Sequence, residues 1–268
     1  MITISVIIPT YKPQQYLDIC LESLEKQTMD KESYEVIVIL NGEKRPYFSA
    51  IQRKLNSCSF SFQLFYTPQL GVSNARNIGI NHAKGNCITF IDDDDYVSPS
   101  YLESLYKPVA KNPSAIIVSN VLTCTEAGMS LGKDYIGNAF DRFSAQPSNS
   151  LFKKRKFLSS SCCKLIPMSI IKDRRFDTKL KLREDAMFMF ELSDEIQDIV
   201  LADKECVYYR RLRTNSASRK VQPIRQKLRN KWLLIITICN IYRKHLLRYN
   251  FFLFLSRVVA FLLSSPVR

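Results

Sequence analysis

Strand-like and helix-like segments alternate along the first 122 residues of the chain. Short runs dominated by β-branched and aromatic residues are typical of strands that are buried on both faces. We predict such strands at residues 2–9, 34–40, 60–66, 87–91 and 115–122. Helices are predicted between them at residues 13–27, 46–56, 72–82 and 98–107, the last with Ser98 as its N-cap. This alternation predicts an α/β fold, in which a mostly parallel sheet carries helices on both faces and binds ligands beyond the carboxyl ends of its strands.

The pattern is weaker in the second half of the chain. Residues 123–150 are predicted to form loops or a hairpin, and the basic run 153–156 is interpreted as the solvated face of a helix. We predict a helix at residues 185–196 and a strand at residues 199–209. These elements would complete the domain that the first half begins.

The C-terminal segment 219–268 is predicted to be a helical, basic tail. Its two apolar stretches, residues 232–241 and 251–263, are ten and thirteen residues long. A membrane-spanning helix needs about 20 apolar residues, so these stretches argue against a span. Two alternatives remain: the tail lies on a membrane surface, or its apolar stretches pack back onto the domain as core.

The charge of the chain is concentrated at its C-terminal end. Residues 1–203 carry 24 basic and 24 acidic side chains, whereas residues 204–268 carry 15 basic side chains and one acidic one. The formal net charge of +14 therefore belongs to the last quarter of the chain. A neutral body with a cationic end indicates an anionic partner, either nucleic acid or a phospholipid surface.

Cysteine and histidine usage bears on the compartment and on metal chemistry. The eight cysteines form no C-x-x-C pair, which favours a reduced, intracellular protein over a disulfide framework. The chain has only two histidines, His82 and His245, so a zinc site made of cysteine and histidine is not expected.

Four consecutive aspartates, residues 92–95, directly follow the predicted strand 87–91. An acidic surface turn is one interpretation, but four adjacent carboxylates repel one another at the end of a buried strand. A hard divalent cation removes that conflict, because Mg²⁺ and Mn²⁺ prefer oxygen ligands. Side chains alternate along an extended segment, so we expect Asp92 and Asp94 on one side and Asp93 on the other.

Six motifs, in order along residues 2 to about 218, resemble those of the family 2 glycosyltransferases, which have the nucleotide-sugar-binding fold called GT-A. The matching runs are VIIPTYK (6–12), GVSNARNIGI (71–80), FIDDDDYVSPSYLESL (90–105), CCKLI (162–166), RFDTKLKLREDAMF (175–188) and YYRRLRTNSAS (208–218). The resemblance implies a catalytic domain at residues 1–218, with a nucleotide-binding half (1–122) and an acceptor-binding half (123–218). It also implies that a sugar is transferred from a nucleotide diphosphate with inversion at the anomeric carbon.

The resemblance also implies roles for particular residues. Asp92 and Asp94 match the family's D-x-D motif, which binds Mn²⁺ or Mg²⁺, and Asp95 matches a further acid whose role is less fixed. Asp185 matches the general base that takes the proton from the acceptor hydroxyl. Without the resemblance, Glu184 and Asp185 would be interpreted as acids that cap the following helix.

Further residues match the family's contacts to the nucleotide-sugar. These candidates are Pro9, Tyr11, Asn41, Arg76, Asp92 and Asp93. One departure concerns the end of the second strand, where the family commonly has Asp-Asp-Gly-Ser and this chain has Leu40-Asn41-Gly42-Glu43. The acid that accepts a hydrogen bond from uracil is therefore replaced by an amide, which leaves the nucleotide base open.

The sequence therefore predicts a metal-dependent, inverting glycosyltransferase. The expected donor is a nucleotide diphosphate-sugar, most simply a UDP-sugar, and the expected acceptor is a polysaccharide or a lipid-linked oligosaccharide. The basic tail predicts a cytoplasmic enzyme that is peripheral on the inner face of the cell membrane. Two alternatives are a nucleic-acid-binding protein, which leaves the aspartates unexplained, and a sugar nucleotidyltransferase, which usually has a glycine-rich loop where this chain has Thr10-Tyr11-Lys12-Pro13.

Overall fold

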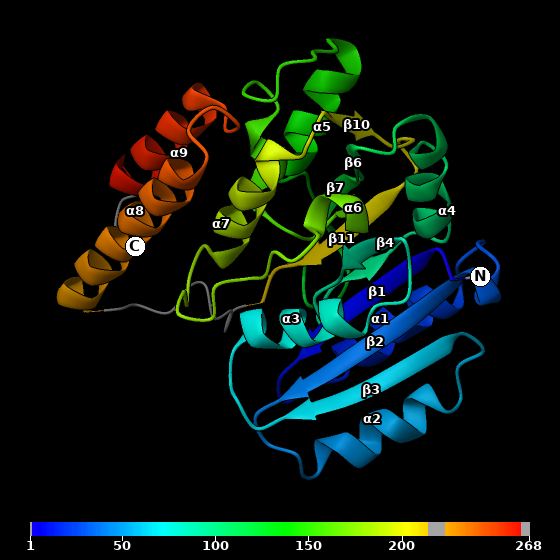
Figure 1. Ribbon diagram of the computed structural model, residues 1–268. Helices are drawn as coiled ribbons and strands as arrows, with labels where there is room; N and C mark the ends of the chain where they lie inside the picture. The colour runs from blue at the N-terminus through cyan, green and yellow to red at the C-terminus, as the bar shows by residue number, and fades with distance from the viewer. Residues whose placement is uncertain (1, 214–222, 264–268) are drawn as a thin grey trace.

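A twisted, mostly parallel sheet runs through the centre of the molecule in Figure 1, a computed structural model that describes residues 2–213 and 223–263. Within these residues the sheet has seven strands in the order β10-β6-β9-β4-β1-β2-β3. The strands are β1 (Ile4–Thr10), β2 (Tyr34–Asn41), β3 (Ser61–Thr67), β4 (Cys87–Phe90), β6 (Ala115–Val118), β9 (Lys164–Pro167) and β10 (Asp198–Leu201). Only β9 runs antiparallel to its neighbours β4 and β6 in this sheet of the described chain. The predicted α/β fold is confirmed.

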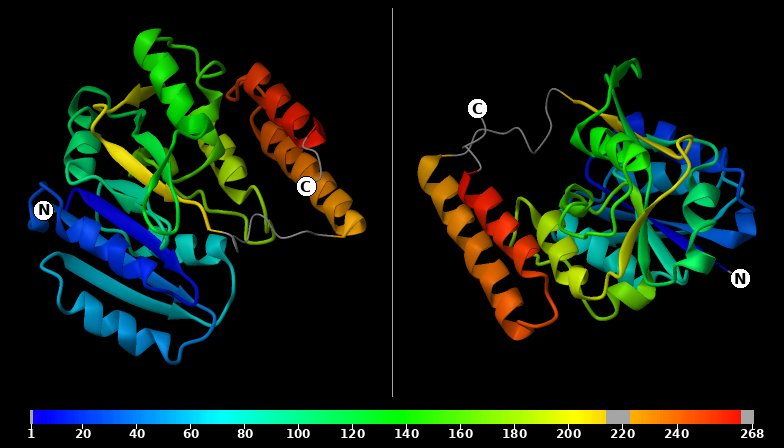
Figure 2. Two further views of the ribbon diagram at one scale, coloured as in Figure 1. Left: turned by 180° about the vertical axis from the view of Figure 1, so that it is seen from behind. Right: turned by 90° about the horizontal axis from the view of Figure 1, so that it is seen from above.

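Helices cover both faces of this sheet (Figures 1 and 2). The helices of the first half are α1 (Tyr16–Glu25), α2 (Tyr47–Leu55), α3 (Val72–His82) and α4 (Tyr101–Tyr106). Gly79 of α3 faces β1, and a Cβ atom at this position would lie 2.4 Å from the Cγ2 atom of Ile7. The missing side chain lets α3 lie close against β1 and β2, so its N-terminal end reaches the carboxyl edge of the sheet.

A second, smaller sheet stands beside the first. Its strands are β5 (Tyr96–Val97), β11 (Val207–Arg211), β7 (Asn120–Cys124) and β8 (Ser130–Gly132), hydrogen-bonded in that order. Because β5 follows the four aspartates directly and pairs with β11, the small sheet fixes the far side of the acidic segment.

Two predicted strands are each divided between the two sheets. The chain leaves β6 at Ser119, whose N–H donates to the carbonyl of Cys163 at 3.1 Å, and then enters β7 in the small sheet. The predicted strand 199–209 is likewise two strands, β10 and β11, separated by a turn in which the Cys206 N–H donates to Asp203. The predictions of single strands were wrong, because a continuous apolar run does not reveal that a strand changes sheets.

The segment 123–150 contains the predicted hairpin, formed by β7 and β8, and also a helix that the prediction missed. Helix α5 (Tyr135–Ala145) begins after Asp134, whose Oδ1 accepts hydrogen bonds from the N–H groups of Ile136 and Gly137. Its buried residues Ile136, Ala139, Phe140 and Phe143 follow helical spacing. This signal was present in the sequence.

Two predictions about particular side chains were wrong. Ser98 does not cap a helix, since α4 begins at Tyr101 and the Ser98 hydroxyl donates to the carbonyl of Glu205 at 2.9 Å. The run 153–156 is not uniformly solvated, because Lys154 is buried and its Nζ lies 2.7 Å from Oδ1 of Asp198. In both cases the side chain joins segments that are far apart in the sequence.

The tail consists of two helices, α8 (Ile224–Lys244) and α9 (Phe251–Leu263), which lie side by side against α7 (Glu184–Glu191) (Figure 2). Ile238 and Leu253 are fully buried, and the ring of Tyr249 stacks on Phe190 at 5.2 Å between centroids. One side of the tail therefore packs onto the domain. Among the described residues, no helix is both long enough and apolar enough to cross a membrane. The predicted boundary at 218/219 and the tail residues Arg219 and Lys220 lie outside the described residues.

Candidate active site

The acidic segment leaves β4 at the carboxyl edge of the sheet and brings three carboxylates together. Oxygen atoms of Asp92, Asp94 and Asp95 all lie within 4.8 Å of one another. Asp93 is not part of this group, and its Oδ2 accepts a hydrogen bond from Thr10 at 2.5 Å. Asp92 and Asp94 share a side as predicted, but the predicted reason was wrong: residues 92–95 form a turn, in which the Asp95 N–H donates to the Asp92 carbonyl at 3.0 Å, and Asp95 joins the same side. Burial, with the charges of Asp94 and Asp92, raises the pKa of Asp93 to about 7.

Asp95 is the most deeply buried of the four aspartates and holds the two sheets together. Its carboxylate accepts hydrogen bonds from the hydroxyl of Tyr208 and the N–H of Arg211, both at 2.7 Å. Burial raises its pKa well above the usual range, and the charges of Asp94 and Asp92 add to this effect. These bonds anchor β11 beside the acidic segment.

Arginines at the end of β11 and just after it neutralise part of this negative charge. Nε of Arg213 lies 2.6 Å from Oδ2 of Asp94, and Nε of Arg211 donates to the carbonyl of Asp94 at 3.0 Å. Neither arginine was predicted to be a site residue. The run of basic residues in YYRRLR was the available signal: it belongs to a matching motif and to the cationic end, but no role was predicted for its arginines.

Arg76 of α3 connects the acidic cluster to the predicted base. It is almost completely buried, with Nη2 2.9 Å from Oδ1 of Asp92 and Nη1 2.5 Å from Oδ1 of Asp185. Its guanidinium lies beside the two contacting rings of Phe90 and Phe176, at 5.9 and 5.4 Å from their centroids. These contacts make Arg76 a residue that positions two carboxylates, whereas a direct phosphate contact stays a prediction.

Asp185 stands in the first turn of α7, with its carboxylate turned toward the loop before β9. It accepts hydrogen bonds from the N–H of Ser161 at 3.2 Å, from the Ser161 hydroxyl at 3.1 Å and from the Ser160 hydroxyl at 3.4 Å. These donors belong to the loop before β9 and not to α7. An acid that caps a helix accepts instead from the N–H groups of its own first turn. The neighbouring Glu184 is also buried, and burial raises its pKa to about 7.

A buried lysine stabilises the loop whose serines bind Asp185. Lys164 is fully buried, and its Nζ donates to the carbonyls of Ser160 and Cys162. The motif CCKLI contained this lysine, but sequence reasoning gave no role to it or to Ser160 and Ser161. Residues of this kind support a site without carrying its chemistry, so spacing alone does not reveal them.

A single cavity of about 370 Å³ joins the acidic cluster to Asp185. Its walls come from the acidic segment, from the loop before β9, from the start of α7 and from the end of β11. The lining residues are Asp92, Asp94, Asp95, Tyr135, Ser159, Ser160, Arg183, Glu184, Asp185, Arg210, Arg211, Leu212 and Arg213. The elements that build the cavity span more than a hundred residues of sequence.

The other predicted nucleotide contacts lie at the ends of β1 and β2. Tyr11 is about half exposed, and Gly42 lies against its ring, because a Cβ atom at Gly42 would come within 2.9 Å of the Tyr11 Cε2 atom. Pro9 is buried within β1. Asn41 is buried, donates to the carbonyl of Thr10 at 2.8 Å and accepts from the N–H of Gly71 at 3.2 Å. A nucleotide contact by each of these residues stays a prediction.

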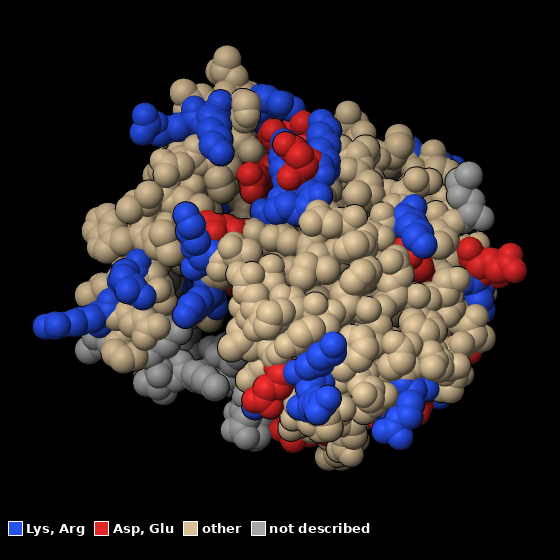
Figure 3. Space-filling view, turned by 60° about the horizontal axis from the view of Figure 1, so that its bottom comes forward, with Lys and Arg blue, Asp and Glu red and all other residues tan. Residues whose placement is uncertain are grey.

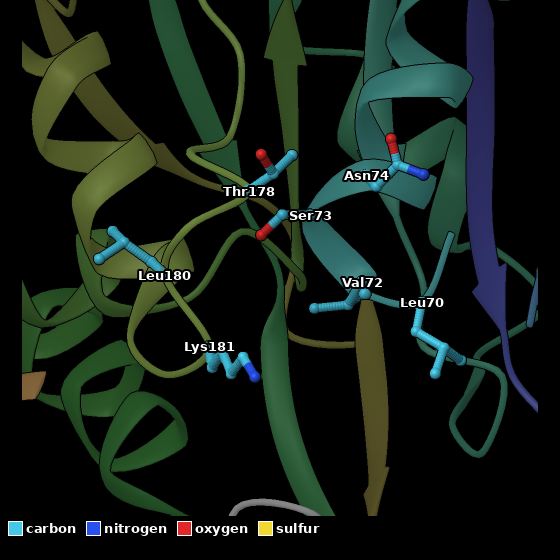
Figure 4. Close-up of a pocket in the computed structure, with 8 residues that line it drawn as sticks. Leu70, Val72, Ser73, Asn74, Thr178, Leu180 and Lys181 are labelled. Carbon is cyan, nitrogen blue, oxygen red and sulfur yellow. The ribbon is translucent and has the colours of Figure 1, made fainter. Parts of the chain in front are cut away.

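A second cavity, of about 290 Å³, lies at the N-terminal end of α3 (Figure 4). Ser73 and Thr178 face it together with Lys181, and Leu70 and Val72 form its apolar wall. The hydroxyl of Ser73 is buried without a hydrogen-bond partner. This cavity lies beside Gly71, which bonds to Asn41, so it adjoins the predicted nucleotide region.

The sequence also matches a family model. The model, described as Glycosyl transferase family 2, matches residues 5–174. This match spans more than half of the 268 residues, so the chain belongs to the family 2 glycosyltransferases.

Curated relatives share this part of the chain. Glycosyltransferase GlyA of Streptococcus pneumoniae is 29% identical over 225 residues, which are 81% of this chain and 31% of that protein. Poly(ribitol-phosphate) beta-N-acetylglucosaminyltransferase TarS of Staphylococcus aureus is 26% identical over 78% of this chain and 35% of that protein. The chain thus spans about a third of the length of these two relatives.

Solved structures confirm the GT-A type of fold. Residues 1–349 of S. aureus TarS, solved in complex with UDP-GlcNAc, align over 90% of this chain and 67% of that one, with a TM-score of 0.70 and 18% identity. The mannosyltransferase PcManGT from Pyrobaculum calidifontis, solved with GDP-Man and Mn²⁺, aligns over 97% of this chain and 70% of that one, with a TM-score of 0.67 and 13% identity.

Proposed function

We propose that the protein is a metal-dependent, inverting glycosyltransferase that moves a sugar from a nucleotide diphosphate to a hydroxyl group of a glycan or lipid-linked acceptor. The observation that carries this proposal is the shared cavity of Asp92, Asp94 and Asp185. Arg76 donates hydrogen bonds to both Asp92 and Asp185. Its guanidinium therefore joins a predicted metal ligand to the predicted base. Family membership supports the reaction class.

The donor set fits a hard divalent cation. Asp92, Asp94 and Asp95 offer carboxylate oxygens within 4.8 Å of one another, and oxygen ligands are those that Mn²⁺ and Mg²⁺ prefer. Burial and the charge of Asp92 raise the pKa of Asp94, which marks a surplus of negative charge that a cation would balance. Asp92 and Asp94 would hold the ion, which supplies positive charge for the departing diphosphate.

Asp185 would accept the proton of the acceptor hydroxyl as the hydroxyl oxygen attacks the anomeric carbon. The hydrogen bonds from Ser160 and Ser161 fix the direction of its carboxylate, and Nη1 of Arg76 pairs with Oδ1 of Asp185. Attack from the face opposite the leaving diphosphate gives inversion. Arg76 and Lys164 act as positioning residues, because they hold Asp185 and its loop.

The donor would extend from the acidic cluster toward Tyr11. The half-exposed ring of Tyr11 offers a flat apolar surface to a nucleotide base. The structures of TarS with UDP and with UDP-GlcNAc support a UDP-sugar as the donor. The names of TarS and of the Bacillus poly(ribitol-phosphate) beta-glucosyltransferase support a polymeric acceptor.

The tail would hold the enzyme at the inner face of the cell membrane. The helix pair exposes large apolar residues on the side that does not pack onto the domain, and residues 206–268 contain no acidic side chain. The exposed apolar residues are Leu228, Trp232, Ile236, Leu246, Leu247, Phe251, Phe252, Leu255, Val259, Leu262 and Leu263. Blue side chains project from the left edge of Figure 3, where α8 and α9 lie. Apolar and cationic groups on one surface are complementary to an anionic bilayer.

A thermal-shift screen tests the donor site. The intact protein is heated with UDP, GDP or ADP, each with and without Mn²⁺. We expect one nucleoside diphosphate to raise the melting temperature, and we expect EDTA to remove that rise. Stabilisation by a nucleoside triphosphate alone would favour the nucleotidyltransferase alternative instead.

A further inference from the structure

One end of the cavity is lined by hydroxyl groups and arginine. Tyr135 comes from α5, Ser159 from the 3₁₀ turn Arg155–Ser159, and Arg183 directly precedes α7. The hydroxyls of Tyr135 and Ser159 lie 2.9 Å apart. Ser159 adjoins Ser160, whose hydroxyl bonds to Asp185. This end of the cavity therefore lies next to the predicted base.

Arg183 is held in an unusual backbone conformation. Its φ angle is 61°, in the left-handed region that favours glycine. The guanidinium lies over the ring of Phe261 of α9, 5.7 Å from the centroid. An arginine at a position where glycine would be less strained indicates that the side chain is needed there.

A second arginine reaches the same region from the tail. Nη2 of Arg257 in α9 donates to the carbonyl of Arg155 at 3.1 Å, while its Nε is shielded from solvent and has no hydrogen-bond partner. Burial lowers the pKa of Arg257 to about 10, although the nearby Tyr135 opposes this shift; the charges of Arg155 and Arg183 lower the pKa further. The cation is half-buried and lies near two other cations.

No carboxylate balances this positive charge. Among residues 2–213 and 223–263, none of the arginines Arg155, Arg183 and Arg257 forms an ion pair, whereas five other arginines do. The paired ones are Arg76, Arg174, Arg210, Arg213 and Arg248. Arg183 is exposed, and Arg155 and Arg257 are half-buried, so three cations gather here without a carboxylate of the described chain and offer positive charge to an external anion.

We propose that Arg183 and Arg257, with the hydroxyls of Tyr135 and Ser159, bind a phosphate group of the acceptor. The proposal rests on the proposed function, and it adds that the hydroxyl which Asp185 activates lies close to a phosphate in the same acceptor. Guanidinium groups bind phosphate oxygens through paired, charge-assisted hydrogen bonds, and hydroxyl groups donate further ones. The phosphate can belong to a phosphodiester-linked polymer or to the diphosphate of a lipid-linked glycan.

The donor's diphosphate does not explain these arginines. It would lie with the metal at Asp92 and Asp94, whereas Tyr135 bonds to Ser159, the neighbour of the Ser160 that bonds to Asp185. Moreover, α9 supplies Phe261, whose ring lies against the Arg183 guanidinium, and Arg257, which binds the Arg155 carbonyl, so the tail supports this end of the cavity from outside its lining. A tail that lies on a membrane would thus bring this end close to a lipid-linked or surface-bound acceptor.

Calorimetric titration tests the proposal on the full-length protein with the donor site filled by UDP and Mn²⁺. One arm uses a short ribitol-phosphate oligomer, and the other a citronellyl-diphosphate monosaccharide. We expect one of them to bind, and we expect Arg183→Gln and Arg257→Gln each to weaken its binding at least tenfold. Lys156→Gln is the matched control. It removes an exposed charge from the 3₁₀ turn that contains Ser159, and it should change binding less than twofold.

The outcomes separate the two proposals. Binding of the oligomer alone assigns the phosphate to a polymer, and binding of the lipid diphosphate alone assigns it to a lipid-linked acceptor. If neither probe binds while UDP with Mn²⁺ does, or if both variants bind like the wild type, the phosphate site is wrong. If UDP with Mn²⁺ does not bind, the proposed function itself fails. Retained UDP binding shows that a variant is folded, and Arg257→Lys, which keeps the charge, should retain more binding than Arg257→Gln.

Discussion

The two ends of the active-site cavity carry opposite charge. At one end, Asp92, Asp94 and Asp95 crowd together, and Arg76 and Arg213 neutralise them only in part. At the other end, Arg183 lines the cavity with the hydroxyl-bearing Tyr135 and Ser159, and neither Arg183 nor the Arg257 behind it pairs with a carboxylate among the described residues. Asp185 lines the same cavity. The acidic end suits a cation with a diphosphate, and the basic end suits an anionic acceptor, so the charge of the cavity orders the two substrates along it.

The largest expected effect comes from the predicted base. Asp185→Asn keeps the size of the side chain and one accepting oxygen but cannot accept a proton. We expect turnover to fall by about 10²–10⁴, the usual contribution of a general base, with nearly unchanged binding of the nucleoside diphosphate. Turnover is measured as nucleoside diphosphate release in the presence of acceptor.

Glu184→Gln is the matched control for that variant. The pKa of Glu184 is raised to about 7 by burial, so much of the population already carries a proton near neutral pH, and glutamine resembles that form. We expect its effect on turnover to stay below about tenfold, well under the range for a general base. If Asp185→Asn leaves turnover unchanged, or if the variant does not fold, Asp185 is a structural residue and not the general base.

The next prediction compares two neighbouring aspartates of the acidic segment, Asp94 and Asp93. Asp94→Ala should abolish the Mn²⁺-dependent part of nucleotide binding, because Asp94 belongs to the group of converging carboxylates. Asp93→Asn should be much milder, because Asp93 faces Thr10 and an amide oxygen can still accept that hydrogen bond. The measurement is a UDP titration with and without Mn²⁺. Equal losses in both variants would mean that the segment acts as a general acidic patch.

A smaller effect is expected from the tail. Arg225 and Arg229 are exposed on α8, and each Lys or Arg near an anionic bilayer contributes about 1 kcal/mol. Changing both to Gln should therefore weaken binding to anionic liposomes by about 2 kcal/mol at low salt, and added salt should reduce the difference. The matched control changes the exposed Arg53 and Lys84 of the catalytic domain to Gln.

Liposome sedimentation gives the readout for these variants. If the wild-type protein ignores anionic liposomes at low salt, the tail is only a packing element of the domain. Point variants suit this test better than truncation, because Ile238 and Leu253 are buried against the rest of the molecule. Removing the tail would expose the residues that they cover.

The smallest effect concerns the nucleotide end beyond the acidic cluster. Gly42 has a φ of +97°, and an added Cβ would lie 2.7 Å from the Leu70 side chain and 2.9 Å from the Tyr11 ring. Gly42→Ala should lower the free energy of unfolding by about 1–2 kcal/mol and weaken nucleotide binding by displacing Tyr11. Gly128→Ala has a comparable φ of +85° with no atom within 4 Å, so it should affect stability alone. Equal nucleotide affinity in both variants would show that Tyr11 does not contribute to nucleotide binding.

The sequence predicts the donor end better than the acceptor end, and the reason is physical. Strands β1, β2 and β4 are buried on both faces, so their apolar runs and the aspartates that follow β4 are legible in the sequence. The acceptor end is assembled from segments without periodicity of their own. Ser119 moves the chain from one sheet to the other, and only the pairing of β11 with β7 shows where the arginines after it lie.

The roles of supporting residues are the hardest to predict. Lys154 and Lys164 read as ordinary surface lysines, yet both are buried and bind backbone carbonyls. Arg257 stands within an apolar stretch and gives no sign in the sequence that α9 places it beside Arg155. Such roles depend on which segments meet in space, and single-sequence patterns carry little information on those contacts.

Product analysis of the intact chain tests the central claim most directly. The protein is incubated with a panel of nucleotide diphosphate-sugars, Mn²⁺ and a phosphate-bearing glycan acceptor, and the released nucleotide is identified by chromatography. We predict that one donor releases nucleoside diphosphate, that EDTA stops the release, and that Asp185→Asn slows it by about 10²–10⁴. Release of pyrophosphate from a nucleoside triphosphate, or nucleoside diphosphate release that survives both EDTA and Asp185→Asn, would contradict the account.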